Sequence, residues 1–188
     1  GLIMSDAICT EASTKMGKAI DAMLDEFTKV RTGRANPAIL NDLTIDYYGT
    51  PTPVTQIAAV KAADGHSLVI TPWDKTSLRA IEKAIMTSDI GITPANDGNV
   101  IRLPFPAPSE EGRKESVKKC REIAEHARVS VRNIRRDANA QYGKLAKDAE
   151  ISEDEQHRGE AAIQKITDEH VAKIDKLLKD KEIEVMEV

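Results

Sequence analysis

Residues 117–145 read VKKCREIAEHARVSVRNIRRDANAQYGKL, and this stretch has the most regular pattern in the chain. Apolar or small residues recur there at alternating steps of three and four, with one polar exception at Gln141, over four heptads. Such a pattern is typical of a helix with a coiled-coil-like seam. The seam positions are Val117, Cys120, Ala124, Ala127, Val131, Ile134, Ala138, Gln141 and Leu145.

The helix that carries this seam is expected to cover residues 109–148. Ser109 is a suitable N-cap, and Glu110 and Glu111 suit the positive end of the helix dipole. At 1.5 Å per residue the helix would be about 60 Å long, which is too long for the core of a spherical domain. The sequence therefore predicts an elongated helical bundle.

Two further stretches have a helical period, residues 5–32 and 153–186. The first repeats apolar residues at Ala12, Met16, Ala19, Met23, Phe27 and Val30, and the second at Ile163, Ile166, His170, Ile174 and Leu177. Aromatic residues make up only 3% of the chain, which fits aliphatic packing between helices. We expect an antiparallel three-helix bundle.

The region between the first two helices has a different composition. Short strand-like runs at residues 43–48, 56–60, 67–71 and 100–103 are separated by Gly and Pro, and residues 77–87 have a helical pattern. The predicted fold is therefore α+β, with a small β/α/β domain at residues 35–108 inserted into a discontinuous bundle of residues 4–34 and 109–188. The connecting residues include Ala35, Asn36, Pro104 and Pro106, which are either a hinge or an ordinary pair of rigid loops.

The net charge of −4 hides two segments of opposite charge. Residues 113–147 contain 11 Lys and Arg against 4 Asp and Glu, whereas residues 148–188 contain 6 against 13. The local charge of each segment, and not the net charge of the chain, therefore decides whether it attracts an anionic or a cationic partner. Two isolated cysteines indicate a reducing compartment. Without an apolar run that could span a membrane, or a secretory signal, the expected location is cytoplasmic.

Four arginines fall within one sector of the second long helix, beside the apolar seam: Arg128, Arg132, Arg135 and Arg136. Guanidinium groups at this spacing can each grip a phosphate. Arg132 has like charges four residues away on both sides, which costs helix stability and hints at an anionic partner. A solvated basic face, or pairing with the acidic third helix, is the alternative interpretation.

A second basic cluster stands at the end of the first helix, where Arg31 and Arg34 flank Gly33. Glycine permits close approach to a ligand and arginine suits phosphate, although a simple helix C-cap explains the same residues.

Catalysis is not predicted. The histidines, at positions 66, 126, 157 and 170, have no metal-ligand spacing, and neither a Walker A sequence nor a nucleophile elbow is present. We therefore expect no catalytic residues, no metal and no cofactor.

Four separated motifs resemble ribosome recycling factors in order and spacing: residues 30–37 (VRTGRANP), 45–53 (IDYYGTPTP), 79–85 (RAIEKAI) and 129–139 (VSVRNIRRDAN). The resemblance implies an L-shaped monomer that binds rRNA of the large ribosomal subunit. It also implies that elongation factor G and GTP, hydrolysed by that partner, then split the post-termination ribosome. The resemblance also extends to the rRNA-contacting residues, which it places at Arg31, Gly33, Arg34, Arg132, Arg135 and Arg136. A helical adaptor that docks a basic protein partner through its acidic third helix is the rival hypothesis.

Overall fold

The computed structural model describes residues 2–187 in two compact units. The helical unit contains the residues up to Phe27 together with Val117–Glu184, and the sheet unit contains Thr28–Ser116 with residues 185–187. The predicted fold class, long helices with an inserted small sheet domain, is confirmed. Residue 188, the last residue of the predicted bundle, lies outside the described residues.

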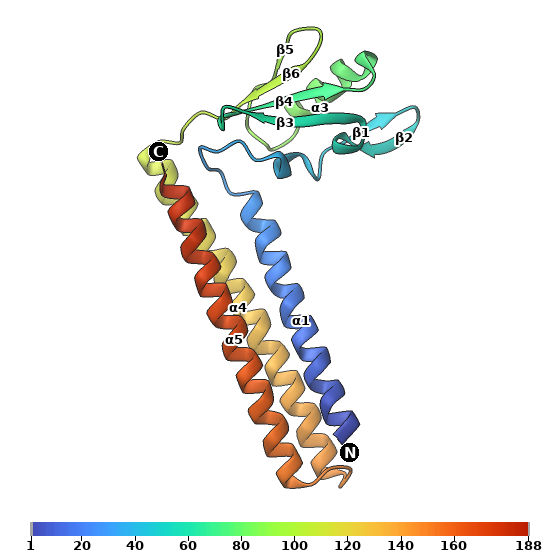
Figure 1. Cartoon of the computed structure of the whole chain (residues 1–188), viewed down its shortest axis with the longest axis vertical. Coiled ribbons are helices and arrows are strands. Elements are labelled where there is room, and N and C mark those ends of the chain that lie inside the picture. The colour runs from blue at the N-terminus through green and yellow to red at the C-terminus, as the bar shows by residue number, and fades with distance from the viewer. Residues whose placement is uncertain (1, 188) are drawn as a thin grey trace. The chain divides into compact units, whose positions relative to one another are not determined.

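Most of the length of three long helices makes up the helical unit: α1 (Leu2–Thr28), α4 (Glu110–Lys147) and α5 (Glu153–Met186). Helix α4 runs antiparallel to the other two (Figure 1). The predicted cap at Ser109 is present, since its Oγ accepts a hydrogen bond from the Gly112 amide at 3.0 Å. Ser152 caps α5 in the same way, with its Oγ accepting a hydrogen bond from the Glu155 amide at 3.1 Å. These contacts satisfy amides that the first helical turn leaves without partners.

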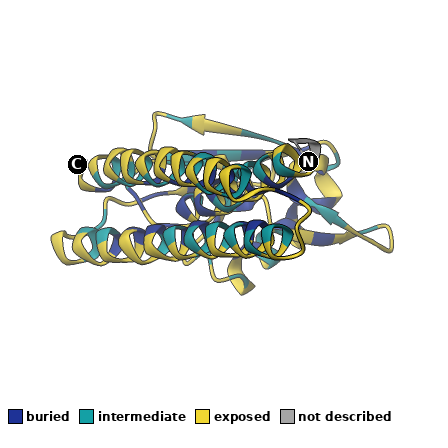
Figure 2. Ribbon diagram, turned by 90° about the horizontal axis from the view of Figure 1, so that it is seen from below, coloured by how far each residue is buried: buried dark blue, intermediate teal, exposed yellow. Residues whose placement is uncertain are grey.

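The core of the helical unit lies along the inner stripes of the three helices, and buried and exposed positions alternate along them (Figure 2). The predicted stripes were wrong by one residue at three places, because a straight helix repeats every 3.6 residues and a strict alternation of three and four drifts from it. At each place the chain takes a four-residue step, so that the buried residue is Ile20 rather than Ala19, Tyr142 rather than Gln141, and Thr167 rather than Ile166.

Helix α1 ends at Thr28, four residues before the predicted boundary. Beyond it, buried Thr32 accepts a hydrogen bond from the Arg34 amide at 3.2 Å through Oγ1. Such a local side-chain contact offers the backbone an alternative to the helical ladder.

The sheet unit contains two antiparallel sheets. Strands β1 (Thr44–Tyr47) and β2 (Thr50–Pro53) form a hairpin, whose two-residue turn places Tyr48 at φ 51° and Gly49 at φ 85°. The second sheet has the order β3-β4-β6-β5, with bounds Ala58–Ala63, Ser67–Pro72, Ile101–Pro104 and Ala95–Asn96. Helix α3 (Leu78–Thr87) contributes Leu78, Ile81 and Ile85 to the core of this unit.

The prediction of a strand over residues 56–60 was wrong at its start. Residues Val54–Ile57 form the short helix α2, and strand β3 begins only at Ala58. Val54 and Ile57 are both buried, which is the three-residue spacing of a helical turn rather than the alternation of a strand. Strands β2 and β5 were not predicted, because neither has an alternating apolar pattern. Two short 3-10 helices, η1 (Pro37–Leu40) and η2 (Lys75–Ser77), complete the unit.

Candidate nucleic-acid interface

Helix α4 carries the larger arginine cluster on one side of the helical unit. Val131 and Ala138 are buried in the bundle, and the four arginines lie beside the buried stripe that these residues belong to. The four arginines differ in exposure: Arg136 is exposed, whereas Arg128, Arg132 and Arg135 are partly buried. They also differ in whether a carboxylate pairs with them: Arg128 and Arg132 have such a partner, and Arg135 and Arg136 have none among the described residues.

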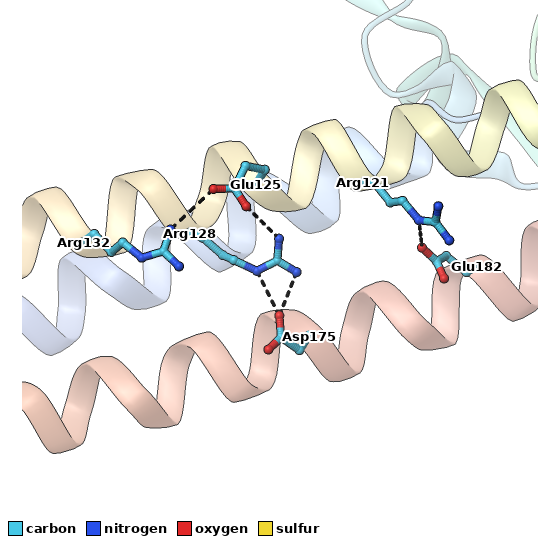
Figure 3. A network of polar contacts seen from close by, with 6 residues as sticks. All are labelled: Arg121, Glu125, Arg128, Arg132, Asp175 and Glu182. Carbon is cyan, nitrogen blue, oxygen red and sulfur yellow. Dashed lines mark hydrogen bonds and ion pairs between the residues drawn. The ribbon is translucent and has the colours of Figure 1, made fainter.

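Arg128 is held on both sides by carboxylates (Figure 3). Its Nε and Nη2 donate to Asp175 Oδ1 of α5 at 2.9 and 2.7 Å, and its Nη1 donates to Glu125 Oε2 at 3.1 Å. Burial by itself would lower the pKa of Arg128, but the hydrogen bonds to Asp175 and Glu125 outweigh it and raise the pKa above its usual value. This guanidinium therefore joins α4 to α5. For Arg128, this agrees with the alternative interpretation that the arginines pair with the acidic third helix.

Glu125 also contacts a second arginine of the cluster. Its Oε1 accepts a hydrogen bond from Arg132 Nη1 at 3.4 Å, and the side chain of Arg132 remains 42% exposed. A separate pair, Arg121 Nε to Glu182 Oε1 at 2.8 Å, links the same two helices further along (Figure 3). The arginine pattern in the sequence gave no indication that Glu125 contacts Arg132, seven residues away.

Arg135 and Arg136 lie beyond this network. Within residues 2–187, neither makes an ion pair or a side-chain hydrogen bond. Each guanidinium therefore keeps all five N–H donors for a ligand. Two consecutive residues of α4 therefore carry positive charges that no carboxylate among the described residues neutralises.

The smaller cluster belongs to the sheet unit. Arg34 forms an ion pair with Glu187, while exposed Arg31 makes no ion pair among the described residues. A Cβ at Gly33 would lie 3.7 Å from Pro108 Cδ, an ordinary contact, so packing does not require a glycine there. The predicted RNA-binding role of these three residues stays a prediction.

The two connecting segments that were predicted as a hinge both bond to the turn between β3 and β4. The Ala35 amide donates to the carbonyl of Gly65 at 2.9 Å, and the Phe105 amide donates to the carbonyl of His66 at 2.7 Å. Asn36 caps η1 through its side chain, which accepts from the Ala38 amide at 3.0 Å. Pro104 ends strand β6 and Pro106 follows Phe105. The two prolines therefore stiffen the chain on both sides of the hydrogen bond from the Phe105 amide.

Neither a metal centre nor a membrane span is found in the described part of the chain. Residues 2–187 contain no group of three or more His, Cys, Asp or Glu side chains placed to hold a metal ion. None of their helices is both long and apolar enough to cross a membrane.

Comparison with known proteins gives the family. The sequence profile of the ribosome recycling factor family matches residues 23–186. The chain belongs to this family. Ribosome recycling factors from Bacillus subtilis and Thermosipho africanus are 50% and 48% identical to it, each covering 98% of this chain and 100% of the relative.

Two solved structures of ribosome recycling factors share the fold. A solution structure aligns with a TM-score of 0.80 at 37% identity and covers 98% of both chains. The Thermus thermophilus factor aligns with a TM-score of 0.67 at 45% identity, covering 97% of this chain and 99% of that one. That second structure describes the factor, together with Escherichia coli elongation factor G, bound to the Escherichia coli post-termination complex.

Proposed function

We propose that this chain binds the large ribosomal subunit after termination and, with elongation factor G and GTP, splits the post-termination ribosome. The observation that carries this proposal is the match over nearly the whole chain to ribosome recycling factors, at about half of all positions. The relative that has been described together with elongation factor G on the post-termination complex supports the choice of partners. GTP hydrolysis belongs to elongation factor G, and this chain acts as a monomer without a cofactor or a catalytic group of its own.

The rRNA contacts are assigned to the unpaired arginines first. Arg135 and Arg136 have free donors for phosphate, and exposed Arg31 is equally free of ion pairs within the described residues. The side chain of Arg132 remains partly exposed despite its contact with Glu125. Arg128 is assigned mainly to the link between α4 and α5, because its donors already have carboxylate partners.

Sedimentation of post-termination ribosomes tests the proposal. We expect free subunits to accumulate only when this protein, elongation factor G and GTP are all present. The matched control replaces GTP by a non-hydrolysable analogue, which should leave most ribosomes joined. Intact ribosomes in the complete mixture would contradict the proposal.

The helical adaptor remains the second hypothesis, and the acidic residues of α5 are what favour it. Residues 148–188 carry the excess of 13 Asp and Glu over 6 Lys and Arg. An adaptor would bind a basic protein through α5 and would not need Arg135. Ribosome binding that survives Arg135→Ala and Arg136→Ala together, but is lost when α5 carboxylates are neutralised, would select it.

A further inference from the structure

Glu125 stands between two arginines of the α4 cluster and contacts both. Oε2 accepts from Arg128 at 3.1 Å and Oε1 accepts from Arg132 at 3.4 Å. Asp175 binds the opposite side of Arg128, which gives a continuous chain of alternating charges across the two helices (Figure 3). The two acids and two bases of this chain sum to a net charge of zero, so the cluster is less basic here than its sequence indicates.

The members of this chain are not equally accessible. The side chain of Arg128 is only 18% exposed, whereas Glu125 and Arg132 are 57% and 42% exposed. Asp175 fixes the partly buried Arg128, and Arg128 in turn fixes one oxygen of Glu125. The other oxygen is therefore held beside Arg132, on the accessible side of the cluster.

Glu125 neutralises the charge of Arg132 but occupies only part of its hydrogen-bonding capacity. A guanidinium has five N–H donors, and Glu125 takes one of them through Nη1. A phosphate that approaches Arg132 is repelled by Glu125 and gains only where its oxygens match the remaining donors. Arg135 and Arg136, one turn further along, have no such neighbour among their described contacts and attract any phosphate.

We propose that Glu125 is a specificity-determining residue: it screens Arg132 from loosely placed phosphates and leaves that arginine to a phosphate held in position by folded rRNA. The inference rests on the proposed function and deepens it. Electrostatic attraction to the RNA backbone carries no information on sequence or shape, so an arginine freed from its carboxylate binds all RNA more tightly. A negative charge beside an arginine lowers binding to the wrong partner, which is how repulsive elements produce specificity.

The test compares Glu125→Gln with Glu122→Gln. Glu122 is an exposed acid one turn earlier on α4, so its substitution changes the net charge equally without touching Arg128 or Arg132. Dissociation constants are measured for large ribosomal subunits and for poly(U), an unstructured RNA, over a range of salt concentrations. Melting temperatures are measured for both variants.

Glu125→Gln should tighten binding to poly(U) by up to about fivefold, the upper end of the range expected for losing an exposed ion pair. Its log–log salt slope should steepen by about 0.7, since one more arginine neutralises a phosphate. Binding to large subunits should tighten less, so the preference for subunits over poly(U) falls. With Arg132→Gln already present, Glu125→Gln should no longer change that preference.

Three results would overturn the inference. Equal tightening by Glu122→Gln would show an effect of net charge alone. Weaker binding to both RNAs with a lowered melting temperature would make Glu125 a structural support of α4. An unchanged preference in Glu125→Gln, with a wild-type protein that still splits ribosomes, would reject the role of Glu125 and leave the proposed function standing. A wild-type protein that fails to split ribosomes would instead overturn the proposed function, and the inference with it.

Discussion

Gly159 on α5 lies against the aromatic ring of Tyr142 on α4, so closely that a Cβ at position 159 would stand 2.4 Å from Cε1 of the ring. Tyr142 is fully buried, so its ring is enclosed by the packed core. Glycine is therefore required at position 159 by packing, because only a residue without a side chain lets the two helices approach around this ring.

Gly159→Ala should destabilise the protein by about 1–3 kcal/mol, the usual cost of overpacking a filled core. The matched control is Gly17→Ala, because a Cβ at that position of α1 would meet nothing within 4 Å. There the better helix propensity of alanine should stabilise by up to about 1 kcal/mol. Thermal melts should show opposite shifts, of about 2–4 °C for each kcal/mol. A rise in melting temperature for both variants would show that the Tyr142 ring can move.

Tyr142 also marks the limit of what the sequence could predict of the fold. The periodic apolar stripes were enough to predict three long helices and, with the Gly and Pro punctuation, an inserted sheet domain. They placed Gln141 on the seam, because a heptad alternation was extended where the straight helix takes a four-residue step. Tyr142 can take the buried position because Gly159 leaves room for its ring, and Gly159 belongs to another helix.

Stability should fall at high pH because of the same tyrosine. Burial raises the pKa of Tyr142 to about 12 from the ordinary value of 10.0. Between these values the unfolded chain has lost the proton and the folded chain retains it, so stability decreases as pH rises through that window. The decrease should be about 1.4 kcal/mol per pH unit from this group. Below pH 10 both states are protonated, and the effect is absent.

Tyr142→Phe isolates this contribution. The variant loses the hydrogen bond from Oη to the carbonyl of Ser5 at 2.7 Å and the contact with Cys9 Sγ at 3.0 Å, which should cost about 1 kcal/mol near neutral pH. Between pH 10 and 12 its unfolding free energy should decline less steeply than that of the wild type. Parallel curves from denaturant titrations would show that the Tyr142 hydroxyl is not shielded from solvent.

Arg135→Ala and Arg128→Ala should separate binding from stability. Arg135 makes no described ion pair, so its loss should leave the melting temperature unchanged and remove a charge-assisted contact worth about 1.5–3 kcal/mol. That is roughly a tenfold to hundredfold loss of affinity for large subunits. Arg128→Ala should instead lower the melting temperature, because Asp175 and Glu125 lose their shared partner. Equal effects of the two substitutions on stability would contradict this division.

The candidate site was predictable in its composition but not in its pairing. The spacing of arginines within α4 shows from the sequence alone that they share a side of the helix. Which of them meets a carboxylate depends on the register between α4 and α5, which sets Asp175 opposite Arg128. That register follows from packing along two long helices, and no short motif in the sequence indicates it.

His66→Ala should loosen residues 33–35 of the sheet unit. The ring Nδ1 of His66 lies 3.0 Å from the carbonyl oxygen of Gly33, and since a carbonyl only accepts, this nitrogen carries the hydrogen and donates. Without the ring, the Ala35 amide should exchange with solvent faster, as measured by hydrogen–deuterium exchange, because its bond to Gly65 lies in the same connection. His66→Gln, which keeps an N–H donor, is the matched control. Unchanged protection of Ala35 in the alanine variant would show that its backbone bond alone holds the segment.

The salt dependence of subunit binding should report how many arginines are free. Each phosphate contact contributes about −0.7 to the log–log slope for single-stranded RNA, so six engaged arginines would give roughly −4. Three of the six already have carboxylate partners, namely Arg34, Arg128 and Arg132. A paired arginine brings no net charge to the phosphate, because the carboxylate that it leaves must be neutralised in turn.

The remaining three arginines, Arg31, Arg135 and Arg136, predict a slope of about −2 between about 50 and 200 mM salt at constant magnesium. Titration of labelled protein with large subunits measures it, and Arg135→Ala should bring the slope about 0.7 closer to zero. A slope near −4 would show that the ion pairs with Glu187, Glu125 and Asp175 open on the ribosome. A flat response would show that phosphate contacts do not drive binding, and would favour the helical adaptor.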